Sequence, residues 1–93
     1  MILKQIPINA SKNFAYIIAD ETTREAAVID PGHGPEEILR QAQQLNVQVK
    51  YIINTHAHRD HTSGNEELKK KTGAKIVAHI KSPLPKDIAV EDQ

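Results

Sequence analysis

Short apolar runs alternate with polar stretches along the whole chain, and this alternation limits the fold more than any other sequence feature. The first three runs, at 2–8, 14–19 and 26–29, are rich in β-branched residues, so each predicts a strand. The polar stretches 9–13 and 20–24 between them are typical of turns. We expect these three strands to form an antiparallel meander.

Helical patterns alternate with strands in the second part of the chain. Pro35 and an apolar stripe that ends at Leu45 predict a helix, which Asn46 closes. A strand over 47–54, a second helix over 65–72 with Asn65 as N-cap, and a strand over 74–80 follow. The order βββ-α-β-α-β favours a layered α/β fold, which some schemes class as α+β. Residues 81–93 show no periodicity and are expected to form a loose tail.

Composition excludes several classes of protein. The 93 residues suit one domain, and twelve basic and twelve acidic side chains cancel, so neither a nucleic acid nor an acidic membrane is an expected partner. The chain has no cysteine, which excludes disulfides and thiolate metal sites, and no apolar run approaches the ~20 residues of a membrane helix. We expect a cytoplasmic protein whose thin aliphatic core benefits from a partner surface.

Residues 54–65 read NTHAHRDHTSGN and contain three of the five histidines. His56 and His58 are two residues apart, so in extended backbone they project to the same side and can bind one cation. A turn at Asp60 and His61 would direct this second pair toward a second cation nearby. Imidazole and carboxylate ligands suit zinc, iron or manganese. The alternative interpretation of this segment is an exposed polar loop.

The segment THAHRDHTSGN resembles the HxHxDH motif of the metallo-β-lactamase superfamily, and more narrowly its branch of glyoxalase II (hydroxyacylglutathione hydrolase) and persulfide dioxygenase. The resemblance extends to AAVIDPG, YIINTHAHRDHTSGN and KIVAHI, which occur here in the family's order. It implies that residues 1–80 form a truncated domain, the N-terminal half of an αββα sandwich, with the metal site at one edge of the sheet.

The resemblance also implies a ligand set and roles. His56 and His58 would bind the first of two zinc ions, and Asp60 and His61 the second, with iron or manganese as other metals. Asp60 would also act in catalysis by orienting a hydroxide and handling protons. Asp30 would lie near the metals and orient their ligands; its alternative role is to form the turn before Pro31.

Members of the family take further ligands from downstream residues that have no counterpart here. Four ligands shared by two metals leave each metal short of the three that catalytic zinc normally has. We therefore expect the site to be incomplete in this chain. Either a missing C-terminal half or a second copy, paired through the exposed sheet face as a homodimer, would complete the structure.

Three functions follow as hypotheses. The first is metal-dependent hydrolysis of a small thioester of the hydroxyacylglutathione type, and the second is an iron persulfide dioxygenase of the same fold. The third is a non-catalytic, self-associating fragment that binds metal weakly or not at all. His33 is expected at the surface and His79 in a strand, and the role of Arg59 stays open.

Overall fold

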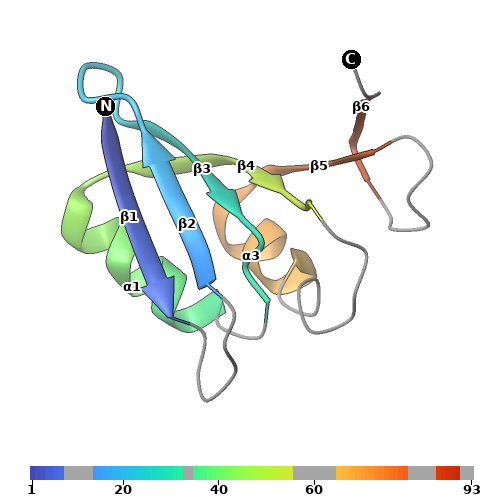
Figure 1. Cartoon of the computed structure of the whole chain (residues 1–93), viewed down its shortest axis with the longest axis horizontal. Helices are drawn as coiled ribbons and strands as arrows, with labels where there is room; N and C mark the ends of the chain where they lie inside the picture. The colour runs from blue at the N-terminus through green and yellow to red at the C-terminus, as the bar shows by residue number, and fades with distance from the viewer. Residues whose placement is uncertain (8–13, 33–34, 56–64, 80–85, 91–93) are drawn as a thin grey trace.

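The computed structural model describes residues 1–7, 14–32, 35–55, 65–79 and 86–90, with the side chain of residue 79 excepted. These residues form one sheet and two helices (Figure 1). The elements are β1 (Ile2–Pro7), β2 (Phe14–Ala19), β3 (Glu25–Ile29), α1 (Pro35–Leu45), β4 (Gln48–Ile53), α3 (Asn65–Thr72), β5 (Lys75–His79) and β6 (Ile88–Val90).

The strands lie in the sheet in the order of the chain, from β1 at one edge to β6 at the other. β1, β2 and β3 pair antiparallel, which confirms the predicted meander. The pairs β3–β4, β4–β5 and β5–β6 are parallel. α1 connects β3 to β4 and α3 connects β4 to β5, as parallel neighbours require a crossover.

Both helices cover the same face of the sheet (Figure 1). α1 contacts β2 and β4, α3 contacts β4 and β5, and the two helices contact each other. The core lies between the helices and this face, and its large side chains are aliphatic, as the composition predicts. The fully buried members are Ile6, Ile17, Val28, Pro31, Ile38, Ile52, Leu68 and Ile76.

Local sequence explains where the helices begin and end. α1 begins at Pro35, whose missing N–H costs no hydrogen bond there, and Asn46 ends it with a φ of 57°. α3 carries Glu66 and Glu67 in its first turn, where negative charge suits the helix dipole. Gly73 ends α3 with a φ of 72° and donates its N–H to the carbonyl of Lys69 at 2.8 Å. Neither helix has the length and apolar character needed to cross a membrane.

The prediction of a loose tail over 81–93 is wrong where the structure describes this segment, because Ile88–Val90 add the strand β6 beside β5. Asp87 explains the pairing. Its backbone N–H donates to the carbonyl of Ile76, and its carboxylate accepts the Ile76 N–H, both at 2.8 Å. The same carboxylate forms an ion pair with Lys69 of α3 at 2.7 Å. The Lys69 ammonium, together with the Ile76 N–H, lowers the pKa of Asp87.

Candidate metal centre

The carboxyl ends of β3 and β4 lie side by side at one edge of the sheet, because the two strands are parallel neighbours. Asp30 follows β3 at this edge, and Asn54 and Thr55 follow β4. The histidine segment begins directly after Thr55. His56, His58, Asp60 and His61 lie outside the described residues, so their role as ligands stays a prediction. Ligand sites commonly occupy this edge in open α/β sheets.

Asp30 holds the end of β4 through its carboxylate. One oxygen accepts the backbone N–H of Thr55 at 2.8 Å, and the other accepts the Thr55 hydroxyl. The Asp30 N–H donates to the carbonyl of Ile53 at 2.9 Å, so backbone and side chain both join the two strand ends. Asp30 adopts a φ of 52°, which few residues other than glycine, asparagine and aspartate accept readily. These bonds fix the position of Thr55, which is the residue directly before His56 in the sequence.

Two buried asparagines flank the histidine segment, one on each side. Asn54 at the end of β4 is 7% exposed, and Asn65 at the start of α3 is 5% exposed. The Asn54 backbone N–H donates to the carbonyl of Val77 at 3.0 Å. Within the described part of the chain, neither amide atom of the Asn54 side chain has a hydrogen-bond partner, nor does the side-chain oxygen of Asn65. The prediction of Asn65 as an N-cap is therefore wrong, since its oxygen accepts no helix N–H.

The residue types of the histidine segment fit a metal such as zinc. Three imidazoles and one carboxylate within six residues form a donor set that zinc, iron or manganese accepts. Buried amide groups ordinarily form hydrogen bonds. The unbonded side-chain atoms of Asn54 and Asn65 can therefore still form such bonds, and the two residues flank the histidine segment in the sequence. In the ranges that the structure describes, no three His, Cys, Asp or Glu side chains gather into a metal site.

Of the predicted site residues, Asp30 is the one that the structure describes. Asp30 lies at the edge where the histidine segment begins, which supports a positioning role beside its role in the turn. Sequence reasoning missed Thr55, although a hydroxyl directly before the first predicted ligand is a usable signal once β3 and β4 are paired. His79 lies in β5, as expected of a strand histidine. His33 and Arg59 lie outside the described residues.

A family model for the metallo-β-lactamase superfamily matches residues 9–85. The chain is also similar to curated relatives. It is 40% identical over 84 residues to a hydroxyacylglutathione hydrolase of Pelagibacter ubique, a match that covers 87% of this chain and 35% of the relative. It is 45% identical over 75 residues to a hydroxyacylglutathione hydrolase of Polaromonas sp., which covers 80% of this chain and 28% of that relative.

Solved structures share the fold. The crystal structure of ETHE1 from Myxococcus xanthus superposes with a TM-score of 0.90 at 28% identity, over 98% of this chain and 41% of that one. The chain thus spans about a third of the length of the curated relatives it matches. The match to ETHE1 covers nearly the whole of this chain, including the mixed sheet and the two helices on one of its faces. Because the family model covers most of the chain, this protein belongs to the metallo-β-lactamase superfamily.

Proposed function

We propose that this chain supplies the first metal ligands of a metal-dependent hydrolase that cleaves a thioester of the hydroxyacylglutathione type. The observation that carries the proposal is the 40–45% identity to two hydroxyacylglutathione hydrolases over most of the chain. The bonds from Asp30 to Thr55 support it, because they hold the start of the histidine segment at the ligand-binding edge of the sheet.

In this proposal His56 and His58 hold one zinc ion, and Asp60 and His61 contribute to a second. Zinc bound there would lower the pKa of a water molecule to roughly 7 and polarise a carbonyl group. Asp60 accepts and returns the proton that thioester hydrolysis moves. Each metal would need further ligands besides these four residues, since they supply two per metal and catalytic zinc normally has three.

Asp30 and Thr55 act as positioning residues. A ligand at the end of a strand keeps its direction only if the preceding backbone is held, and the Thr55 N–H and hydroxyl are both bound to one carboxylate. Removal of residues that support metal ligands in this way typically lowers metal affinity by about 10–100-fold. Asp30 would therefore influence metal affinity without binding the metal.

Zinc titration of the purified chain, followed by calorimetry, tests the proposal. We expect binding in the micromolar range, or about −8 kcal/mol, that is lost in His56→Ala and in His58→Ala. His33→Ala is the matched control, since it removes an imidazole outside the motif and should leave zinc binding unchanged. Hydrolysis of a hydroxyacylglutathione, measured as free thiol, should depend on added zinc.

The outcomes separate the hypotheses. A chain that binds no zinc would contradict the proposed site and favour a non-catalytic, self-associating module. Zinc binding without thioester cleavage would retain the ligands and contradict catalysis by this chain alone. Zinc binding that survives both histidine substitutions would place the metal elsewhere.

The second candidate function is that of an iron persulfide dioxygenase of the same fold. The specific observation in its favour is the match to ETHE1 at 28% identity over 98% of this chain. One bound iron, with oxygen uptake in the presence of a persulfide, would support this candidate. Two bound metals with release of thiol from a thioester would support the hydrolase.

A cytoplasmic location is part of the proposal. The hydroxyacylglutathione hydrolase of Arabidopsis thaliana that is 42% identical over 57 residues carries the word cytoplasmic in its name. Cell fractionation followed by immunoblotting tests this, and recovery of the chain with membranes would contradict it.

A further inference from the structure

Three buried side-chain atoms beside the histidine segment have no hydrogen-bond partner within the described part of the chain. They are the amide nitrogen and oxygen of Asn54 and the side-chain oxygen of Asn65. Both residues are more than nine-tenths buried, so water does not replace the missing partners. A buried amide that loses its bonds to water without forming new ones destabilises a fold. Natural proteins retain such groups chiefly where function requires them.

Both asparagines lie on the inner side of the fold, between the sheet and the helices. Asn54 follows the fully buried Ile52 by two residues, and its backbone N–H continues the pairing of β4 with β5. Strand alternation therefore directs its side chain to the face that the helices cover. Asn65 and Leu68 are the buried residues of α3, and α3 contacts β4. The two asparagines thus flank the histidine segment on the same inner side.

The amide of Asn54 has the chemistry to support metal ligands. An imidazole that binds a metal through one nitrogen usually donates a hydrogen bond from the other, and an amide oxygen is a suitable acceptor. The amide NH₂ group can donate to a carboxylate or a carbonyl oxygen. The segment that begins one residue after Thr55 contains both kinds of group, namely three imidazoles and the carboxylate of Asp60.

We propose that Asn54 is a positioning residue of the metal centre. Its amide gains its hydrogen bonds when the histidine segment binds metal, and these bonds orient the ligands. The inference rests on the proposed metal centre and adds a residue to it that neither the motif nor the bond from Asp30 to Thr55 includes. The unpaired amide lowers the stability of the metal-free chain, and the same amide raises the affinity for metal.

This role predicts opposite effects on stability and on zinc binding. Leucine has a similar branched shape without a polar atom, so Asn54→Leu removes the unpaired amide. The metal-free variant should unfold at an equal or higher urea concentration than the unmodified chain. Its zinc affinity, measured by calorimetry, should fall at least about tenfold. Replacement of a residue that only supports the fold would instead lower the unfolding midpoint and leave zinc affinity unchanged.

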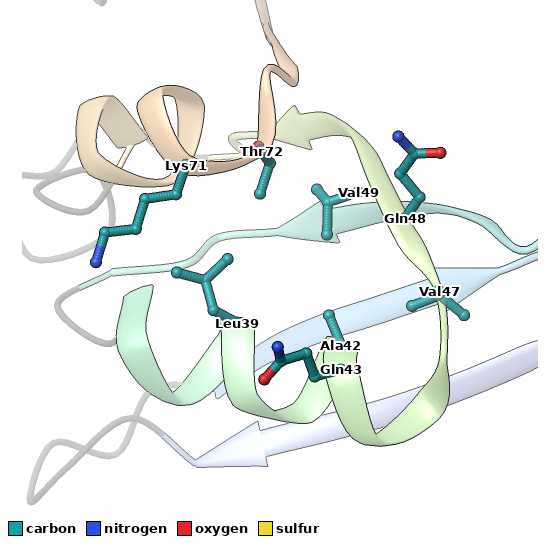
Figure 2. Close-up of a pocket in the computed structure, with 8 residues that line it drawn as sticks. All are labelled: Leu39, Ala42, Gln43, Val47, Gln48, Val49, Lys71 and Thr72. Carbon is teal, nitrogen blue, oxygen red and sulfur yellow. The ribbon is translucent and has the colours of Figure 1, made fainter.

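Two variants serve as matched controls. Gln43→Leu also exchanges an amide for an apolar side chain, but Gln43 lines a hollow beside the amino end of β4, at the other end of the strand from Asn54 (Figure 2). Ile52→Val shortens a buried side chain on the same face as Asn54 and should lower stability. Both variants should bind zinc as the unmodified chain does.

A second measurement uses the unmodified chain and does not depend on how leucine packs. Nuclear magnetic resonance of the chain with isotope-labelled asparagine follows the side-chain amides of its five asparagines. The signal of Asn54 is identified by its loss in Asn54→Leu. Addition of zinc should move this signal downfield, as expected when its protons form hydrogen bonds. Asn46 is exposed at the end of α1 and serves as the internal control, whose signal should not move.

The outcomes distinguish this inference from the proposed function. An unmodified chain that binds no zinc would overturn both. Zinc affinity of Asn54→Leu within about twofold of the unmodified chain would overturn the role of Asn54 alone and leave the metal centre in place. An Asn54 signal that zinc does not move in a zinc-binding chain would also overturn this role, whatever the stability of the leucine variant.

Discussion

Substitution of Asp30 is the sharpest test of how the edge of the sheet is held. Its carboxylate binds both the N–H and the hydroxyl of Thr55, which lies 25 residues away in the chain. A hydrogen bond to a charged group contributes about 1.5–3 kcal/mol, and we take about 1 kcal/mol for each of these two because Thr55 is exposed and water competes. Loss of both bonds should lower the free energy of unfolding by about 2 kcal/mol.

The choice of replacement separates the side chain from the backbone. Asp30 has a φ of 52°, a conformation that costs alanine about 1–2 kcal/mol and glycine almost nothing. Asp30→Gly should therefore lose about 2 kcal/mol, and Asp30→Ala about 3 kcal/mol. Glycine also raises the conformational entropy of the unfolded chain, which lowers the free energy of unfolding by up to about 1 kcal/mol. The relief of backbone strain in the folded chain offsets this loss.

Urea unfolding followed by circular dichroism measures these changes. For a domain of this size, 2 kcal/mol corresponds to a fall of about 8–16 °C in Tm. Thr55→Ser keeps both donors and should stay within about 0.5 kcal/mol of the unmodified chain. In a double-mutant cycle, Asp30→Gly and Thr55→Val should cost about 1 kcal/mol less together than the sum of their separate effects.

An Asp30→Ala chain as stable as the unmodified one, within about 0.5 kcal/mol, would refute this reasoning. Additive effects in the cycle would also refute it, because additivity means that the Asp30 carboxylate and the Thr55 hydroxyl do not interact. If stability falls but zinc affinity is unchanged, Asp30 supports the fold without positioning the predicted ligands.

Three further predictions concern other parts of the fold. Asp87→Asn should lower Tm at pH 7, and this difference should vanish in acid. Lys69 depresses the pKa of Asp87, so the stabilisation by this carboxylate is present above the unfolded pKa of about 3.9 and disappears as pH falls through the folded value. Thermal melts from pH 7 to 2 check this, and a constant difference would contradict it. Ile52→Val should cost about 0.5–1.5 kcal/mol in urea unfolding, because Ile52 is fully buried, whereas Ile53→Val in dilute solution should cost less than half as much. Gly73→Ala should cost about 1 kcal/mol through its φ of 72° alone, since no atom lies within 4 Å of the added methyl group; a neutral result would mean that the end of α3 adjusts.

The helices and most strands could be predicted because the signals that specify them are local. α3 spans Asn65–Thr72, as its acidic first turn and the following Gly73 predict, and β2 spans Phe14–Ala19, the limits of its apolar run. Local spacing and the family resemblance also predict metal ligands in the histidine segment, which the family match over 9–85 includes. The positions of those ligand side chains stay a prediction.

The strand β6 could not be predicted from its own residues. Its three residues carry too little pattern to distinguish a strand from a loop, and their pairing depends on Asp87 reaching both Ile76 and Lys69. The partner of Asp30 was hidden for the same reason. Thr55 becomes its neighbour only when β3 and β4 pair in parallel, with Ile29 beside Ile53.

Periodicity, helix-end residues and the order of apolar runs depend on near neighbours in the chain, so the amino-acid sequence was sufficient for the two helices, the strands β1 to β5 and the aliphatic core. The metal chemistry of the histidine segment stays a prediction. Contacts between distant segments depend on which strands pair and in which register, and no local pattern encodes that choice. The bond from Asp30 to Thr55 and the added edge strand are therefore properties of the tertiary structure.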